Sequence, residues 1–316
     1  MNNMKDFLSK IPVPIVAVSL GLASLGNLLK PSSKFLYAFC GILALIFLLL
    51  MISKIIFCAP TFIEEFRMPV TSSVFASFFM AVMVLTNYIA DRFITFAFII
   101  WVFSVIGHII LIIYFTIRRV YNFSLKDIFP TYFVTYVGII VAAITSVPFK
   151  MQPVGKVIFV FGLAAYVVLF ILITLRYIKH EVHVSLKPLF CIYTAPMSLA
   201  IAGYSAVFEQ KSLKFLFIAG CIAQLLYLIV LTQLPKLLRS QFYPSFAAFT
   251  FPFVITATAL KQVVANISTV ATIPIWMTAL VNIEIFIAII LVSYSVIHYL
   301  IYLYKILPMN RLKSQS

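Results

Sequence analysis

The sequence has little charge and very few acidic side chains. Only 10% of its 316 residues are charged, and eight are Asp or Glu, whereas about 25% of the residues are charged in an ordinary soluble domain. A water-soluble globule is therefore excluded. The longest polar stretches lie at 1–10, 60–68 and 308–316, and each is too short to enclose a hydrophobic core of its own. We expect no separate soluble domain.

Residue types that carry much of protein chemistry are also sparse or badly spaced. The four cysteines form no CxxC pair and no metal-ligand spacing, so we interpret them as small core hydrophobes. His180 and His183 are one residue closer than the zinc-binding HExxH spacing requires. The sequence contains no GxxxxGK[ST] phosphate loop, which excludes nucleotide hydrolysis at such a loop. We therefore expect no cofactor, no metal and no catalytic residues, and an enzyme is disfavoured.

Long apolar runs are what the sequence does contain. Hydrophobic residues make up 64% of the chain, and a helix that spans a bilayer needs about 20 of them in succession. Ten such runs lie at 13–30, 35–57, 69–90, 93–117, 130–149, 153–178, 188–208, 212–234, 244–266 and 274–306. The sequence therefore predicts an all-α integral membrane protein, in which residues 1–316 form a single transmembrane domain of ten helices.

The basic residues are divided unevenly between the two ends of these helices. A net charge of +15 would suggest a nucleic-acid partner in a soluble protein, but in a membrane protein it first reports topology. With a cytoplasmic N-terminus, fifteen Lys and Arg residues fall on the cytoplasmic side and eight on the other side. The positive-inside rule therefore predicts a multi-pass protein of the cell membrane, with both termini cytoplasmic and no nucleic-acid partner.

A proline recurs at or near the start of every odd-numbered run. The five are Pro14, Pro69, Pro130, Pro188 and Pro244, at separations of 55, 61, 58 and 56 residues. Proline is common in the first turn of a helix, which explains each residue alone but not the even spacing. A nearly constant period that contains two helices indicates five copies of a helical hairpin.

The two helices of each hairpin differ in their content of small residues. In matched windows of 18 residues, Gly, Ala, Ser and Thr total 36 in the odd runs and 18 in the even runs. Small residues let helices pack closely inside a bundle, whereas lipid tails accept Leu, Ile and Phe. We therefore predict a quasi-fivefold arrangement, with an inner ring of odd helices around a pore and an outer ring of even helices.

Acidic residues are absent from the predicted inner ring. None of the eight carboxylates falls in the five odd windows, and Glu284 in the tenth run is the only deep one. Pathways for cations usually carry Asp or Glu within the membrane. Their absence favours a path for an anion or a neutral solute.

Four segments carry a resemblance to a known family. PIVAVSLGLASLGN (14–27), PTYFVTYVGIIVAA (130–143), PLFCIYTAPMSLAIAGY (188–204) and SFAAFTFPFVITATALK (245–261) resemble the tellurite-resistance and dicarboxylate transporter family. That family includes the plant slow anion channels, the fungal malic acid permeases and sulfite effluxers. The resemblance implies five hairpins around a pore, usually in a homotrimer. It also implies transport of small inorganic or organic anions, by an anion channel, by a carrier of C4-dicarboxylates such as malate, or by a sulfite or tellurite exporter.

The resemblance further implies a gate. In the family, a phenylalanine before the proline of the FTFPF pattern at 249–253 occludes the pore. This places the gate at Phe251, with Phe249 as the alternative register. Because the chain contains 32 phenylalanines, packing against lipid or other helices is the competing interpretation.

Other residues are candidates for bending or lining the path. Pro196 and Pro252 each remove a helical hydrogen bond and can bend a helix, and three glycines permit bends or close approaches. Helix packing is an equally good interpretation for the prolines and glycines. The glycines are Gly21, Gly138 and Gly203, and the candidate hydroxyls along the path are Ser19, Thr135, Ser198 and Thr256.

Glu284 is expected near the bilayer midplane, where a carboxyl group must be protonated, paired or hydrated. It is a candidate for proton coupling or for a subunit contact, and a neutral, hydrogen-bonded structural role is the alternative. Lys261 could pair with Glu284 or extend to the outer surface. Two functions therefore stay open: a passive anion channel, and a secondary carrier coupled to protons through Glu284.

Overall fold

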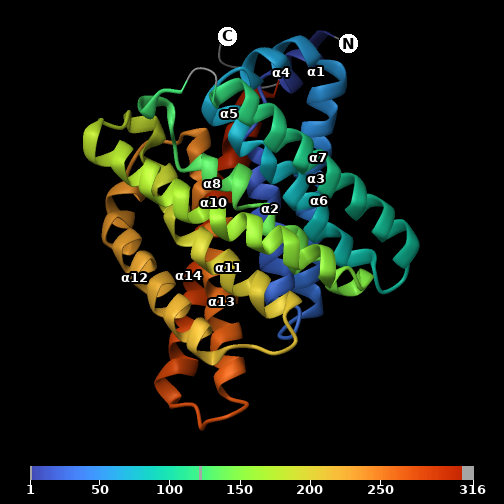
Figure 1. The fold of residues 1–316 in the computed structure, drawn as a ribbon. Helices are drawn as coiled ribbons and strands as arrows, with labels where there is room; N and C mark the ends of the chain where they lie inside the picture. Colours follow the sequence, from blue (N-terminus) through green and yellow to red (C-terminus); the bar gives the residue numbers. More distant parts are fainter. Residues whose placement is uncertain (1, 121–122, 308–316) are drawn as a thin grey trace.

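A computed structural model describes residues 2–120 and 123–307, and every regular element in these residues is a helix (Figure 1). Eight helical segments are long and apolar enough to cross a membrane, judged by length and composition. Two of the predicted runs, 13–30 and 130–149, instead contain shorter apolar helices, Ile15–Leu29 and Thr131–Ile144. The predicted class, an all-helical membrane protein, agrees with this architecture.

Long continuous helices alternate along the chain with segments that are short or broken. The long helices coincide with the even-numbered runs. They are α3 (Lys34–Phe57), α7 (Ile94–Val120), α10 (Gln152–Lys179), α12 (Leu213–Leu238) and α14 (Ile275–Ile306).

The odd-numbered runs form the other set, which we call the five buried segments. They are α2 (Ile15–Leu29), α5 with α6 (Pro69–Val74 and Ala76–Ile89), α8 with α9 (Thr131–Tyr136 and Ile140–Ile144), η3 with α11 (Val184–Thr194 and Ala195–Val207), and η4 with α13 (Pro244–Phe249 and Phe251–Ile267). The remaining short elements are α1 (Asn2–Ser9), α4 (Ala59–Phe66), η1 (Leu125–Asp127) and η2 (Val147–Phe149).

Four of the five buried segments are broken into two pieces, and proline or glycine marks three of the breaks. Pro196 and Pro252 occupy the second positions of α11 and α13, just after the preceding 3₁₀ helices end. Gly138 lies in the break between α8 and α9. Proline has no backbone N–H to donate, so it is best tolerated in the first turn of a helix, where no such bond is needed. The bends expected at Pro196 and Pro252 are therefore changes of helix type at the start of a new helix.

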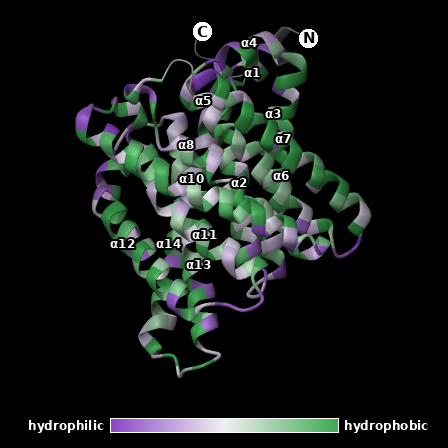
Figure 2. Cartoon of the chain, in the orientation of Figure 1, coloured by the Kyte–Doolittle hydropathy of each residue, from purple (hydrophilic) through white to green (hydrophobic). Residues whose placement is uncertain are grey.

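Burial separates the two sets of segments as their composition does. In the three buried segments that are long enough to span a membrane, 61–78% of the residues in the most apolar stretch are buried inside the structure. In the five long helices, the corresponding share is 28–39%. Among the described residues, none of the large exposed apolar side chains comes from α2, α6, α8, α9, α11 or α13. Figure 2 shows the long helices coloured hydrophobic over most of their length. The long helices therefore present the apolar surface that lipid requires.

Each of the five buried segments contacts the next one along the chain, and the last contacts the first. The helix α2 contacts α6, α6 contacts α9, α9 contacts α11, α11 contacts α13, and α13 contacts α2. Each of α3, α7, α10, α12 and α14 packs against one or more of these segments. Small side chains allow this close approach. At Gly203, for example, a Cβ atom would lie 2.4 Å from the Ile140 side chain.

The beginning and the end of the described chain lie at the same end of the molecule. The helices α1 and α4 lie together there, at the top of Figure 1. Near the end of α14, the hydroxyl of Tyr302 donates to the backbone carbonyl of Lys10 at 3.1 Å. Of the basic residues assigned to the cytoplasmic side, Arg311 and Lys313 lie outside the described residues.

Candidate functional site

A cavity of about 620 Å³ lies among the N-terminal parts of the five buried segments. Every one of these segments contributes to its wall: Pro14 just before α2, Pro69 from α5, Thr131 from α8, Pro196 from α11 and Pro252 from α13. Three of the five periodic prolines, at 14, 69 and 244, are among the lining residues. The recurrent proline therefore marks the ends of helices that meet around a shared space.

The cavity does not reach the C-terminal ends of these segments. Along the chain, its wall ends at Leu20, Met80, Gly138, Leu199 and Pro252 on the five segments in turn. At the opposite side, Lys10, Glu65 and Tyr302 join the wall, and we call this end of the cavity its mouth. The cavity therefore lies in one half of the bundle, toward the end where the described chain begins and ends.

Phe251 belongs to the wall at the closed end of the cavity, directly before Pro252. It is the first residue of α13, and the preceding residue, Thr250, has a backbone conformation outside the helical range (φ −98°, ψ −94°). Its side chain is 6% exposed. The break in the segment therefore brings a large aromatic ring to the level where the cavity stops.

The two neighbouring phenylalanines of the pattern face other elements. The ring of Phe249 packs against Phe246 at 5.1 Å and against Tyr294 of α14 at 6.2 Å. The ring of Phe253 packs against Tyr227 of α12 at 5.8 Å. Neither is part of the cavity wall, and both are fully buried. Of the two registers considered for the gate, Phe251 is the one that lies at the cavity.

Gly21 explains how the break before Phe251 is held in place. A Cβ atom at this glycine would lie 2.4 Å from the Cβ of Thr250 and 3.0 Å from the backbone nitrogen of Phe251. The hydroxyl of Thr250 donates to the backbone carbonyl of Ala17 at 3.1 Å. The backbone of α2 therefore approaches the broken segment at a distance that only glycine permits.

The hydroxyls expected along the path hold helices together instead of facing the cavity. Ser198 and Thr256 both donate to the carbonyl of Thr194, at 2.8 and 3.2 Å, beside the break between η3 and α11. Thr135 donates to the carbonyl of Ser73 at 3.0 Å. Ser19 donates to the carbonyl of Ala44 on α3 at 2.7 Å. None of the four is among the cavity-lining residues.

Of the three expected glycines, one lines the cavity and two do not. Gly138 lines the cavity, in the break between α8 and α9. Gly21 and Gly203 do not line it, and they serve close contacts between segments. The hydroxyls that do line the cavity come from other positions, including Thr71, Ser77 and Thr131. Sequence position alone could not assign them, because small polar residues occur on every side of these helices.

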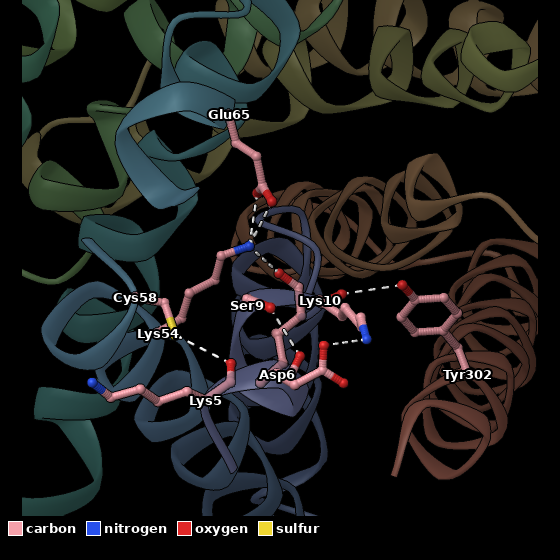
Figure 3. A network of polar contacts seen from close by, with 9 residues as sticks. Lys5, Asp6, Ser9, Lys10, Lys54, Cys58, Glu65 and Tyr302 are labelled. Carbon is pink, nitrogen blue, oxygen red and sulfur yellow. Dashed lines mark hydrogen bonds and ion pairs between the residues drawn. The ribbon is translucent and has the colours of Figure 1, made fainter. Parts of the chain in front are cut away.

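A buried ion pair lies at the mouth of the cavity, and the sequence analysis did not anticipate it. The side chain of Lys54 on α3 is fully buried, and its Nζ lies 2.7 and 2.8 Å from the two carboxylate oxygens of Glu65 on α4. The same ammonium group donates to the carbonyl of Ile11 at 2.6 Å (Figure 3). One lysine thus joins the N-terminal segment, α3 and α4.

Further polar contacts at the mouth join both ends of the described chain. Lys10 forms an ion pair with Asp6 on α1, and the carbonyl of Lys10 accepts the hydrogen bond from Tyr302 (Figure 3). The charged residues in the cavity wall are Lys10 and Glu65. Within the described part of the chain, Glu65 is the only acidic residue of that wall, and Lys54 offsets its charge.

Glu284 lies away from the cavity, within the long helix α14. It is 1% exposed, and the side chain of Gln224 on α12 lies close enough to hydrogen-bond with its carboxyl group. Tyr227 of α12 lies close enough to interact with it electrostatically. Lys261 is half-buried on α13, and the ion pairs of the described residues do not include one between Lys261 and Glu284.

Comparison with known proteins assigns this architecture to a family. Residues 10–298 match the model of the SLAC1 family, which is described as voltage-dependent anion channel. The chain belongs to the SLAC1 family. The resemblance found in the sequence is therefore confirmed, and SLAC1 membership implies an anion channel or transporter and not an enzyme. A search of the curated proteins finds no match.

The matched range contains all five buried segments of this SLAC1-family chain and nearly all of the cavity wall. Of the three residues at the mouth, Lys10 and Glu65 fall within it and Tyr302 does not. Among the described residues, no group of three or more His, Cys, Asp or Glu side chains is placed to hold a metal ion.

Proposed function

We propose that this protein is a passive anion channel in which the cavity is the cytoplasmic vestibule and Phe251 is the gate. The five buried segments form a quasi-fivefold inner ring, and all ten apolar segments cross the membrane. The observation that carries the proposal is the position of Phe251, which lines the cavity at the end where the cavity stops. Both termini lie in the cytoplasm, where the basic residues of that end of the bundle belong.

A phenylalanine ring closes such a path in two ways. It occupies the space that an ion would need, and it offers no hydrogen bond to replace the water that the ion must lose. The rest of the wall near the closed end is also apolar, with Leu20, Met80 and Leu199. Rotation of one side chain would therefore be enough to change the conductance.

The charges of the vestibule favour an anionic solute. Its single acidic residue, Glu65, is paired with a buried lysine, so no free carboxylate of the described wall attracts cations. We infer that the solute is a small inorganic or organic anion. The resemblance keeps malate-like C4-dicarboxylates, sulfite and tellurite as candidates, and a homotrimer with one pore in each subunit as the expected assembly.

Reconstitution tests the channel and its gate together. The full-length protein is placed in planar bilayers and liposomes, and current is recorded alongside the flux of labelled chloride and malate. We expect Phe251→Ala to raise anion conductance above that of the wild type, because the obstruction is removed. Phe249→Ala and Phe253→Ala are matched controls, since they delete the same ring from positions that face α14 and α12.

The sign of the effect separates a gate from a packing residue. Truncating a buried phenylalanine in a core leaves a cavity and costs about 3–5 kcal/mol, which lowers function. If Phe251→Ala inserts and folds but conducts no more than the wild type, Phe251 is not the gate. If Phe249→Ala alone opens the path, the gate lies in the other register.

A proton-coupled carrier is the second candidate, and one observation favours it. Glu284 is a buried carboxyl group within a long apolar helix, and buried carboxyl groups in membrane-spanning helices often belong to proton relays of transporters. Its absence from the cavity wall weighs against the idea, because protonation would have to act on the path through α12 or α13. Flux measured with a pH gradient in place of an anion gradient distinguishes the two functions.

A further inference from the structure

A second, smaller hollow of about 240 Å³ lies outside the cavity, and half of its lining residues are basic. Three of its six lining residues are arginines: Arg67, which follows α4, and Arg118 and Arg119 in the last turn of α7. The other three are Ser72, Tyr114 and Phe115. Three arginines from two separate parts of the chain therefore line one hollow.

Among the residues that the structure describes, no carboxylate forms an ion pair with these arginines. One terminal nitrogen of Arg119 donates to the carbonyl of Arg67 at 2.9 Å, and its guanidinium lies 5.7 Å from the ring centre of Phe115. Like charges held together repel one another. An anion in the hollow would remove this repulsion.

Arg119 also has an unused donor. Its Nε is buried and has no hydrogen-bond partner, and leaving a buried donor unpaired costs free energy. The positive-inside rule explains why arginines lie at this end of α7. It does not explain why they converge on a hollow with Arg67, or why one donor is buried without an acceptor.

We propose that this arginine hollow, lined by Arg67, Arg118 and Arg119, binds a phosphate group. Guanidinium groups bind phosphate oxygens through paired, charge-assisted hydrogen bonds, and one phosphate offers enough acceptors for all three side chains. Basic hollows between helices at the cytoplasmic side of a membrane suit lipid headgroups. A soluble phosphate ester offers the same chemistry.

The position of the hollow connects it with the cavity. Adjacent residues of α5 face the two spaces, since Thr71 lines the cavity and Ser72 lines the hollow. Arg67 lies two residues after Glu65, which belongs to the mouth of the cavity. A bound phosphate would therefore restrain the corner between α4 and α5 beside the cavity wall.

Binding is measured on the full-length protein by its thermal unfolding temperature, so the test is independent of transport. One arm titrates inorganic phosphate onto the protein in phosphatidylcholine nanodiscs. The other arm compares nanodiscs that contain phosphatidic acid with nanodiscs of phosphatidylcholine alone. We use Arg67→Gln and Arg118→Gln, because both side chains are exposed and their loss leaves the core intact. Arg239→Gln at the end of α12 is the control, since it removes the same charge from an exposed position outside the hollow.

We expect phosphate or phosphatidic acid to stabilise the wild type and the Arg239→Gln control. Each variant of the hollow should bind about tenfold more weakly, because one charge-assisted hydrogen bond is lost. A response in the lipid arm alone identifies a headgroup site, and a response in the soluble arm alone identifies a phosphate-ester site. The proposal is overturned if neither arm stabilises the wild type, or if the hollow variants respond as strongly as the control.

Discussion

Lys54 and Glu65 form an ion pair in which the two partners differ sharply in burial. The ammonium of Lys54 lies 2.7 Å from a carboxylate oxygen of Glu65, yet the lysine side chain is fully buried and that of Glu65 is 29% exposed. The lysine comes from the end of a long lipid-facing helix, and the glutamate comes from a short helix at the mouth of the cavity. The pair therefore fixes the mouth to the outer part of the bundle.

Glu65→Gln should destabilise the protein more than Lys54→Met does. In Glu65→Gln, the buried ammonium keeps the carbonyl of Ile11 and a neutral amide oxygen as acceptors but loses its counter-charge, and breaking a buried pair in this way costs on the order of 3 kcal/mol. Without Lys54, the partly exposed Glu65 can be hydrated. The double variant should recover most of the loss seen in Glu65→Gln. Thermal unfolding of the wild type, the two single variants and the double variant is measured in one detergent as a double-mutant cycle. Additive effects of the two substitutions would show that the two residues are not coupled.

Accessibility to a small aqueous thiol reagent should follow the cavity wall. In a background without native cysteines, we expect Thr71→Cys and Ser245→Cys to react, since both positions line the cavity. Ser19→Cys and Thr256→Cys should not react, because these positions are fully buried and bonded between helices. Mass spectrometry of the labelled protein reports the result. Equal labelling of both sets would contradict the described cavity.

Gly21→Ala should disturb the segment that carries Phe251, whereas Gly220→Ala should be tolerated. The new methyl group at position 21 would overlap Thr250 at 2.4 Å, while at position 220 its nearest neighbours are methyl groups of Val263 at 3.7 Å. Overpacking of this kind costs about 1–3 kcal/mol. Thermal unfolding and basal anion conductance are measured for both variants. Similar values for the two would show that α2 does not hold the break in place.

Glu284→Gln should leave the dependence of transport on pH unchanged. The amide has nearly the same shape and can still interact with Gln224 and Tyr227, and position 284 lies outside the cavity wall. Flux is compared in liposomes between pH 5 and pH 8, with wild type as the reference. Loss of pH-driven uptake in a variant that folds normally would favour the proton-coupled carrier over the channel.

The sequence alone determined the class of the protein and the division of its segments. Apolar runs of spanning length can exist only as helices in lipid, because each backbone group must be paired within its own segment. The excess of Gly, Ala, Ser and Thr in alternate segments marked those that are buried, since only small side chains permit such close packing. The resemblance to the family was carried by residues in four of these buried segments.

The tertiary structure decided which side of each buried segment faces the cavity. Pro196, Pro252 and Phe251 lie on its wall, whereas Ser198 and Thr256 turn toward the carbonyl of Thr194. A helix that is buried on all sides has no polar face, so its periodicity does not report orientation. The Lys54–Glu65 pair and the arginine hollow depend on contacts between separate helices, and no local pattern in the sequence encodes those distances.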